Sequence, residues 1–384
     1  MDSPLRVVEL FAGIGAQATA LENLGIPHEC IISETDPHAI AMYEAMHGKT
    51  ENLGDIRLVE HLPDCDLATW TFPCQSVSIA GKMEGMVEGS GSKSSLGWEA
   101  IRLFRDAVER ERQPKFLLME NVRAILSKKN KGEFKRMVDA LSEIGYTSTW
   151  GILKAKDFGI PQFRPRCFLL SVFDHDGIQL PKGTPTDLRI LDFLESEVDE
   201  SFYLSEDRIA VFERHRHRQE ENGRGFGWRP LNPRSPRDRI AKTVTTNPDR
   251  YVSTWILETA STDSGAEIIV SGRLNRPNYH DYNNRVYGVD GIAPTLPAHS
   301  GGDTVPKIDL DPRVRYLTPR ECWRLMGFDD ERIDRAFAVE PSKTARYKAA
   351  GNSIVVPVLE AIFSQILSGF SPNQTTLTQW GCLS

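Results

Sequence analysis

Residues 5–15 have the sequence LRVVELFAGIG, and this stretch decides the fold. Its first seven residues are mostly apolar and have the length of a buried strand, and Gly13 and Gly15 then mark a tight turn. The residues from 16 to about 24 predict a helix, which stops at Gly25. A strand, a glycine turn and a helix in this order are typical of the edge of an open α/β sheet at which ligands bind.

The same alternation of apolar runs and amphipathic stretches continues over the first 180 residues. One helix is predicted to begin at Ser94 or Ser95, which we expect to be its N-cap. A further helix is predicted at about 131–144, and further strands are predicted at 29–33, 67–72, 116–119 and 167–172. Strands that alternate with helices in this way predict a parallel, doubly wound α/β sheet.

The composition changes after about residue 181, where Gly, Pro, Asn and Arg become frequent and the apolar runs become short. This change predicts a second, smaller domain of strands and long loops. Helical patterns return at 318–328 and 355–367, and we expect the second helix to pack back on the first domain. We therefore divide the chain into four parts. The first domain takes residues 1–185 plus 345–370, and the second domain takes residues 186–316. Residues 317–344 form a hinge region, and residues 371–384 form a polar tail.

The charge of the chain is uneven. Its formal net charge is −7, which taken alone argues against a nucleic-acid partner. Residues 187–207 hold eight acids against one arginine, whereas residues 208–250 hold eleven bases against five acids. The acidic stretch lies at the expected junction of the domains, and its basic neighbour has the charge of a surface that binds phosphates.

The composition also narrows the cellular setting. The chain has no apolar run of 18 residues and no basic leader, so we expect no membrane contact. Its six cysteines show no CxxC spacing, which predicts that no metal is bound and favours a reducing compartment such as the cytoplasm.

Three chemically unusual groups follow apolar strands. They are the turn FAGIG, the triplet Pro73-Cys74-Gln75 and the pair Glu120-Asn121. The carboxyl ends of parallel strands form the ligand crevice of an open sheet, so we expect a cofactor loop, a thiol and a carboxylate to meet at one edge.

The glycine turn predicts a nucleoside cofactor. Glu34 follows Gly13 by 21 residues, at the end of the next strand, where an acid usually accepts the ribose hydroxyls. Asp55 follows at a position that could meet an adenine. Ala18 stands where a dinucleotide site would often place its third glycine, so NAD is not favoured. The alternative is a plain tight turn with no ligand.

Cys74, Glu120 and the segment QFRPR at 162–166 are the candidates for chemistry. A thiol at a strand end beside a helix start can ionise and act as a nucleophile. Glu120 ends an apolar run, so burial would raise its pKa and allow it to donate a proton. Each candidate has an alternative interpretation. Cys74 could be a small buried cysteine, Glu120 could be a helix-capping acid, and the two arginines of QFRPR could be a solvated surface pair.

Six segments together resemble the DNA (cytosine-5)-methyltransferases, in that family's usual order. They are ELFAGIG, FPCQSVSIAG, MENV, QFRPR, RYLTPRECWRLMGF and YKAAGNSIVVPV. The resemblance implies a doubly wound, Rossmann-like domain that depends on S-adenosyl-L-methionine, with a smaller target-recognition domain that binds DNA. It also implies a DNA (cytosine-5-)-methyltransferase that flips a target cytosine out of duplex DNA and methylates C5 through a covalent bond between Cys74 and C6.

The resemblance assigns roles residue by residue. Glu120 would protonate or hydrogen-bond N3 of the cytosine, and Arg166 and Arg164 would hold O2 and orient Glu120. The cofactor positions would be Phe11, Gly13, Gly15, Glu34, Thr35, Asp55, Ile56, Pro73, Asn352 and Ile354. The candidates for contact with the nucleic acid are Gln75, Ser78, Arg273, Arg276, Arg285 and Thr295. Thr35 stands where many members place an aromatic residue over the adenine, so cofactor affinity could be weaker.

The implied partners are double-stranded DNA and, where the enzyme protects a host genome, a restriction endonuclease that cuts the same site. We expect a monomer located in the cytoplasm, on the nucleoid. An RNA cytosine-5 methyltransferase is the nearest alternative, because the same site chemistry serves both. A nicotinamide-linked oxidoreductase and a catalytically silent DNA-binding subunit are the other two alternatives. The glycines near 82–95 suit a lid over the flipped base.

Overall fold

The structure is a computed structural model. It describes residues 3–73, 86–87, 89, 93–184, 188, 190–202, 270–273, 285–287, 293–294, 307–310 and 313–368. The predicted lid and polar tail lie mostly or wholly outside the described residues.

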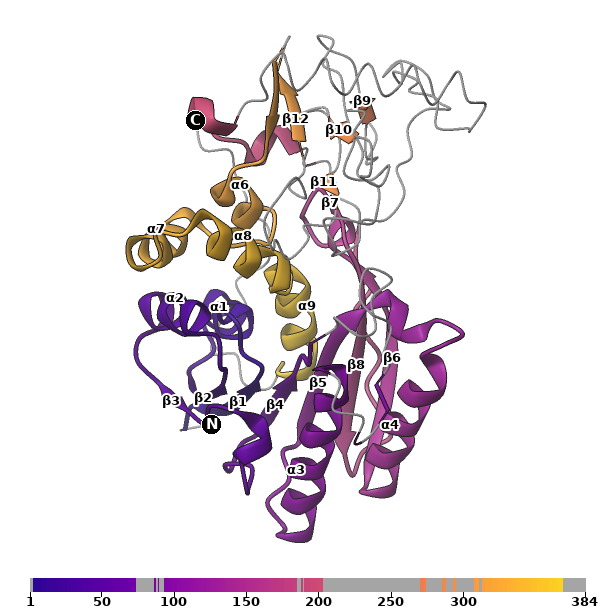
Figure 1. The fold of residues 1–384 in the computed structure, drawn as a ribbon. Coiled ribbons are helices and arrows are strands. Elements are labelled where there is room, and N and C mark those ends of the chain that lie inside the picture. Colours follow the sequence, from indigo (N-terminus) through magenta and orange to yellow (C-terminus); the bar gives the residue numbers. More distant parts are fainter. Residues whose placement is uncertain are drawn as a thin grey trace.

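A seven-stranded sheet forms the centre of the molecule, in the order β3-β2-β1-β4-β5-β8-β6 (Figure 1). Its strands are β1 (Leu5–Leu10), β2 (His28–Ser33), β3 (Glu51–Asn52), β4 (Leu67–Trp70), β5 (Phe116–Val122), β6 (Tyr146–Lys154) and β8 (Pro165–Phe173). The expected doubly wound α/β sheet is thus present, and it is mixed rather than wholly parallel. β8 runs antiparallel to both of its neighbours, β5 and β6.

The antiparallel strand has a simple cause. Parallel neighbours need a long crossover, usually a helix, whereas antiparallel strands need only a short connection. Residues 155–164 join β6 to β8. They contain one 3-10 turn and the two-residue strand β7 (Gln162–Phe163), and no α-helix that could form a crossover. β6 has no strong strand pattern in its sequence and was not predicted, so the antiparallel partner of β8 was not expected.

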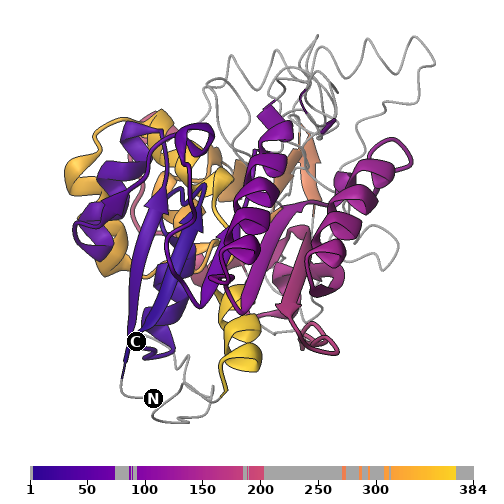
Figure 2. The ribbon, with the colours of Figure 1, turned by 90° about the horizontal axis from the view of Figure 1, so that it is seen from below.

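The α-helices of the described residues are α1 (Ala16–Asn23), α2 (Pro37–His47), α3 (Gly97–Glu109), α4 (Lys131–Glu143), α6 (Pro319–Arg324), α7 (Asp330–Val339), α8 (Lys343–Asn352) and α9 (Val356–Ile366). α1 and α9 pack on one face of the main sheet, and α3 and α4 pack on the other. α7 packs on α2, and α6 packs on α8 and α7. Residues of β5 alternate between two cores: Leu117 and Met119 face α3 and α4, and Leu118 faces the core that includes α1 and α9. α3 and α4 lie side by side in both views (Figures 1 and 2).

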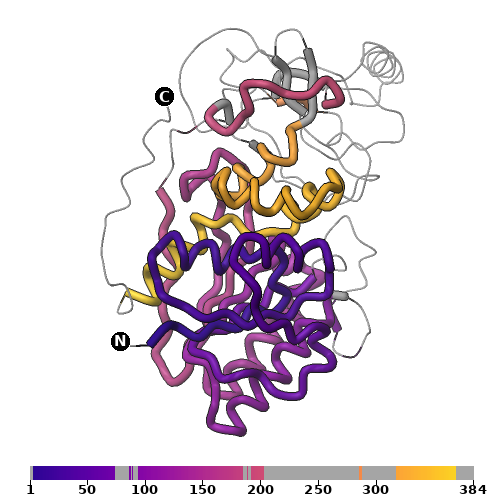
Figure 3. The backbone as a smooth tube through the Cα atoms, turned by 90° about the vertical axis from the view of Figure 1, so that its left-hand side faces the viewer, coloured from indigo at the N-terminus to yellow at the C-terminus, as the bar shows by residue number. Residues whose placement is uncertain are grey.

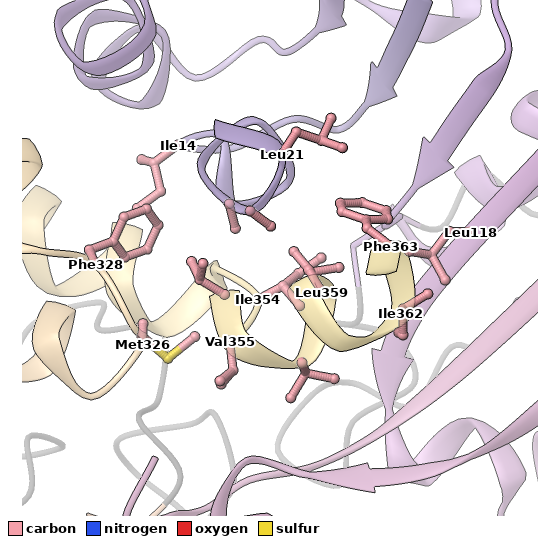
Figure 4. Packing of buried hydrophobic residues seen from close by; sticks show 14 of the residues in the cluster. Ile14, Leu21, Leu118, Met326, Phe328, Ile354, Val355, Leu359, Ile362 and Phe363 are labelled. Atoms are coloured by element: carbon pink, nitrogen blue, oxygen red, sulfur yellow. The ribbon is translucent and has the colours of Figure 1, made fainter. Parts of the chain in front are cut away.

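The C-terminal helix α9 packs against the sheet domain, as its amphipathic pattern predicts. Its Leu359, Ile362 and Phe363 are buried in one cluster with Leu21 of α1 and Leu118 of β5 (Figure 4). The stretch Lys343–Ile366, which holds α8 and α9, is apolar enough to cross a membrane by length and composition. However, 72% of its most apolar 18-residue window is buried inside the molecule, as in a core helix of a globular protein.

The structure also contains a second, four-stranded sheet, whose labelled strands lie beyond α6 in Figure 1. Its strands are β9 (Val270–Arg273), β10 (Arg285–Tyr287), β12 (Lys307–Leu310) and β13 (Arg313–Tyr316). A short strand, β11 (Ala293–Pro294), pairs in parallel with β7 and so joins this region to the main sheet domain. The predicted region of strands therefore exists among the described residues. The expected hinge at 317–344 is largely helical, because it contains α6, α7 and the start of α8. The orange segment with α6, α7 and α8 lies next to the indigo segment with α1 and α2 in Figure 3, where α7 packs on α2.

Part of the acidic stretch is anchored on α6. The Glu195 backbone N–H donates to Glu321, and the Thr318 hydroxyl donates to the Glu195 carboxylate. Arg320 Nε lies 3.5 Å from Glu195 Oε1. These contacts place a carboxylate of the acidic stretch against the basic side chain of Arg320.

Glu22, at the end of α1, links three helices. It accepts from His47 Nδ1 of α2 at 2.8 Å and from Arg332 Nη2 of α7 at 2.7 Å. Partial burial would raise its pKa, but the hydrogen bond and charge of His47, and then those of Arg332, outweigh this and lower the pKa to about 2. Glu22 should therefore stabilise the fold as a carboxylate.

We expect Glu22→Gln to lower the free energy of unfolding by about 1–2 kcal/mol at pH 7, as judged by urea titration. Because the folded pKa lies below the unfolded value, the carboxylate's contribution is present above the unfolded pKa. It is lost as the pH falls through about 2, so the difference from the wild type should shrink from about pH 5 downward. Glu143→Gln, at an exposed position of α4, is the control. A difference that stays constant between pH 7 and pH 3 would contradict the prediction.

Candidate active site

The site lies at the carboxyl edge of the main sheet, where β1 has β2 on one side and β4 on the other. The chain order reverses at this point, which is where open α/β sheets bind ligands. The residues after β1, β2 and β4 meet here with the last residues of β5. Glu120 is inside β5 rather than after it, because β5 continues to Val122 opposite Arg166.

The turn after β1 has three residues in the left-handed backbone region. Phe11, Gly13 and Gly15 have φ values of 61°, 57° and 77°. A Cβ on Gly15 would lie 2.7 Å from the His47 ring, so only glycine fits there, whereas the space beside Gly13 is open. Phe11 is a non-glycine residue in a costly conformation, and such strain is concentrated at functional sites.

Glu34 is held by backbone N–H groups. Its Oε2 accepts from Gly13 N at 2.9 Å, and its Oε1 accepts from Thr35 N and Asp36 N at 2.8 and 2.9 Å. The structure thus brings the glycine turn and the predicted ribose acid together. Asn52, which no sequence motif marks, accepts from Glu34 N and donates to Glu34 O, both at 3.1 Å.

The predicted adenine positions Asp55 and Ile56 follow β3, and Thr35 follows β2, the strand between β3 and β1. Ile56 is 2% exposed and belongs to the core, and Thr35 is exposed. Asp55 accepts two hydrogen bonds from Arg57 Nε, at 3.0 and 3.1 Å, and these bonds lower the pKa of its carboxyl group. Arg57 was not predicted as part of the site, because an arginine at an exposed turn has no distinguishing pattern in the sequence.

Glu120 and Arg166 form a buried pair. Arg166 Nε lies 3.0 Å from Glu120 Oε1, and the two side chains are 10% and 11% exposed. Burial raises the pKa of Glu120, and the charges of Arg166 and Arg164 offset only part of that rise. The raised pKa makes this carboxyl group hold its proton to a higher pH than an exposed glutamate does, which suits a proton donor.

Arg164 donates to the backbone of the turn after α8, whereas Arg166 is paired with Glu120. Arg164 Nη2 donates to the carbonyls of Gly351 and Ser353, at 2.7 and 2.8 Å, and the residue is 3% exposed. These two carbonyls flank Asn352, an exposed residue at the end of α8, and Ile354 is buried just beyond. Arg164 therefore fixes the turn that carries the C-terminal cofactor candidates. The neighbouring Gln162 is also buried and donates to Leu325 O at 2.7 Å.

The candidate nucleophile is not described by the structure. Cys74, Gln75 and Ser78 lie outside the described residues, as do Arg276 and Thr295. Pro73, directly before Cys74, is described, and the preceding Phe72 carbonyl accepts from Asn121 Nδ2 at 3.1 Å. The roles of these residues stay predictions.

Four other cysteines lie in the described part of the chain and are small, buried or half-buried groups. Cys30, Cys65, Cys167 and Cys322 are free thiols and are fully or partly buried. Burial raises the pKa of both Cys65 and Cys167 to about 12, so neither is a thiolate at neutral pH. Within the described part of the chain, no three His, Cys, Asp or Glu side chains are grouped so that they could hold a metal ion.

Two candidate DNA readers fall on described strands. Arg273 is the last residue of β9. Arg285 in β10 is only 5% exposed, inside the second sheet, and this burial favours a structural role over contact with a base edge. A basic residue in a polar segment, such as Arg285, gives no sign in the sequence that it will be buried.

The chain matches the model of one protein family over residues 5–368, and that family is described as C-5 cytosine-specific DNA methylase. It is 30% identical to the type II methyltransferase M2.ScrFI of Lactococcus lactis subsp. cremoris, over 94% of this chain and 99% of that protein. It is also 30% identical to the orphan methyltransferase M.SPRI of Bacillus phage SPR, over 94% and 97% of the two chains.

A solved structure has the same fold. The crystal structure of the S. pombe Dnmt2 methyltransferase aligns with a TM-score of 0.62 and 19% identity, over 96% of this chain and 99% of that chain. At this level of identity the likeness concerns the fold alone.

Proposed function

Because the chain belongs to the C-5 cytosine-specific DNA methylase family, we propose that it methylates C5 of a cytosine flipped out of duplex DNA. The observation that carries the proposal is the buried pair of Glu120 and Arg166 at the carboxyl edge of the sheet. A carboxyl group with a raised pKa at the ligand edge suits protonation of a ring nitrogen.

The residues at the glycine turn fit S-adenosyl-L-methionine. The open space beside Gly13 admits a ligand close to the backbone, and Glu34 is fixed next to that space by three N–H groups. When bound, this cofactor supplies a methyl group on a positively charged sulfur. The residues that would hold it are Phe11, Gly13, Gly15, Glu34, Thr35, Asp55, Ile56, Pro73, Asn352 and Ile354.

In the proposed reaction the Cys74 thiolate bonds to C6 and Glu120 delivers a proton to N3. These two steps make C5 nucleophilic, and C5 then takes the methyl group. The sulfur that gave up the methyl group is left as a neutral thioether. A base removes the C5 proton, Cys74 leaves C6 as a thiolate, and N3 returns its proton to Glu120, so that the aromatic ring and the enzyme groups are restored. Arg166 holds Glu120 in place, whereas Arg164 acts through the turn around Asn352.

We propose that the catalytic domain takes residues 1–185 and 345–370, that residues 186–316 recognise the target, and that the two are joined by 317–344. Arg-rich 208–250 would contact phosphates, which give affinity rather than sequence preference. The relatives carry type II and phage methyltransferase names, which supports a role in restriction-modification or a phage. A monomer in the cytoplasm, bound to the nucleoid, fits this role.

The proposal is tested by incubating the chain with duplex DNA and labelled S-adenosylmethionine, then detecting 5-methylcytosine. A competition between duplex DNA and tRNA separates the DNA enzyme from an RNA cytosine-5 methyltransferase. Label that enters only tRNA, or no nucleic acid at all, would contradict the proposal. Bisulfite sequencing of DNA from cells that express the chain would also return the target sequence.

We expect duplex binding to weaken steeply with salt although the whole chain carries a net charge of −7. Phosphate contacts from the basic segment release counterions, so affinity should fall at least about tenfold between roughly 50 and 200 mM salt. Fluorescence anisotropy with labelled duplex measures this dependence, and the affinity for S-adenosylmethionine serves as the control. A flat salt dependence of duplex binding would contradict the assignment of 208–250 to the DNA surface.

A further inference from the structure

One hydrogen bond joins the two ends of the segment that contains Cys74. The Ser94 hydroxyl donates to the Pro73 carbonyl at 2.7 Å, across 21 positions of the chain. Ser94 is fully buried, at 0% exposure. The acceptor is the carbonyl of the peptide bond that leads directly into Cys74.

Ser94 does not have the role that its position in the sequence suggested. We expected Ser94 or Ser95 to cap the helix that follows. The N-cap of α3 is Leu96 instead, and no side chain makes a capping hydrogen bond there. The bond from the Ser94 hydroxyl goes to the strand-end segment, not to the first turn of the helix.

The neighbouring residue Phe72 is held from two other elements. Its carbonyl accepts from Asn121 Nδ2, at the end of β5, at 3.1 Å. Its ring lies against Gly97, the first residue of α3, where a Cβ would come within 2.9 Å of the ring. Two successive carbonyls, Phe72 and Pro73, are thus each fixed by a side chain just before the candidate nucleophile.

We propose that Ser94 is a positioning residue for the reaction and acts through the peptide bond between Pro73 and Cys74. This inference rests on the proposed function, in which Cys74 attacks C6. The peptide unit is planar, so holding the Pro73 oxygen also fixes the direction in which the chain enters Cys74. The thiol must stand within about 3–3.5 Å of the carbon it attacks, and small misplacements lower the rate sharply.

The test compares Ser94→Ala with a matched control. Ser171→Ala removes another serine of 0% exposure, which lies in β8. Its hydroxyl forms a hydrogen bond of 2.7 Å with the hydroxyl of Ser148. We expect Ser94→Ala to slow single-turnover methyl transfer by about 10- to 100-fold. We expect it to slow covalent trapping on 5-fluorocytosine duplex by the same factor. The affinities for S-adenosylmethionine and duplex should stay within about twofold, and Ser94→Thr, which keeps the hydroxyl, should recover part of the rate.

The outcomes separate this inference from the function on which it rests. If the wild type neither methylates nor is trapped, the proposed function fails. If the wild type is trapped and Ser94→Ala is trapped at the same rate, the function stands and the role of Ser94 is overturned. Equal losses of melting temperature and of rate in Ser94→Ala and Ser171→Ala would show a merely structural serine, and would also overturn it.

Discussion

Cys74→Ala is expected to lower methyl transfer to cytosine by at least about 10⁴-fold, because no other group can then form the bond to C6. Binding of S-adenosylmethionine and of duplex DNA should remain, since the proposed reaction uses the thiol to attack C6 and not to bind the cofactor or the duplex. The measurement combines single-turnover transfer of labelled methyl groups with trapping on 5-fluorocytosine duplex. The wild type should form a stable adduct with this duplex, and Cys74→Ala should form none.

Cys65→Ala is the matched control for this variant. Cys65 is 5% exposed, and burial raises the pKa of its thiol to about 12, so it supplies no thiolate at neutral pH. Its replacement should cost some stability and leave the rate of methyl transfer nearly unchanged. Undiminished turnover by Cys74→Ala, or an adduct that depends on Cys65, would contradict the covalent mechanism.

The sequence predicts the elements whose apolar pattern is strong. β1, β4, β5 and β8 are short, mainly apolar runs, β2 holds the apolar triplet at residues 30–32, and α3 and α9 carry clear apolar faces. β6 was missed because its residues, YTSTWGILK, are mostly half-exposed and include several polar side chains. α8 was missed because its buried face consists mainly of alanine and glycine, which give little apolar contrast. Both elements are defined by the neighbours they pack on, and a single sequence does not show those neighbours.

The site divides in the same way. The spacing of Gly13 and Glu34 carries information, because adjacent parallel strands end at the same edge, and the structure joins the two residues by a hydrogen bond. The partners of Arg164 lie 187 and 189 positions further along the chain, and no local pattern connects them. The hydrogen bond from Ser94 to Pro73 spans 21 positions and likewise cannot be predicted from a local sequence pattern. Local chemistry thus indicates the candidate reacting groups, and long-range contacts define what holds the described ones among them.

Glu120→Gln is expected to lower the rate of methyl transfer by about 10²–10⁴-fold and to leave the fold intact. The amide keeps the size of the side chain and an oxygen for Arg166, but it has no proton to give to N3. The pKa of Glu120 is raised by burial, so in the wild type the rate should fall as the pH rises through that raised value. The variant should lose this alkaline decline. Single-turnover rates between about pH 5.5 and pH 9 measure both effects.

Stability gives the second half of this test. A group whose folded pKa is raised stabilises the fold below its unfolded pKa, and this contribution is lost as the pH rises through the folded value. Glu120→Gln removes that loss, so its melting temperature at pH 8 should match or exceed that of the wild type while activity is low. Glu360→Gln is the matched control. Glu360 is also a buried glutamate whose pKa is raised by burial, but it lies in α9 and accepts a hydrogen bond from Asn23 at the end of α1. Glu360→Gln should retain the wild-type rate and its alkaline decline. Equal losses of rate in the two variants would assign the effect of Glu120 to packing and remove it from the reaction.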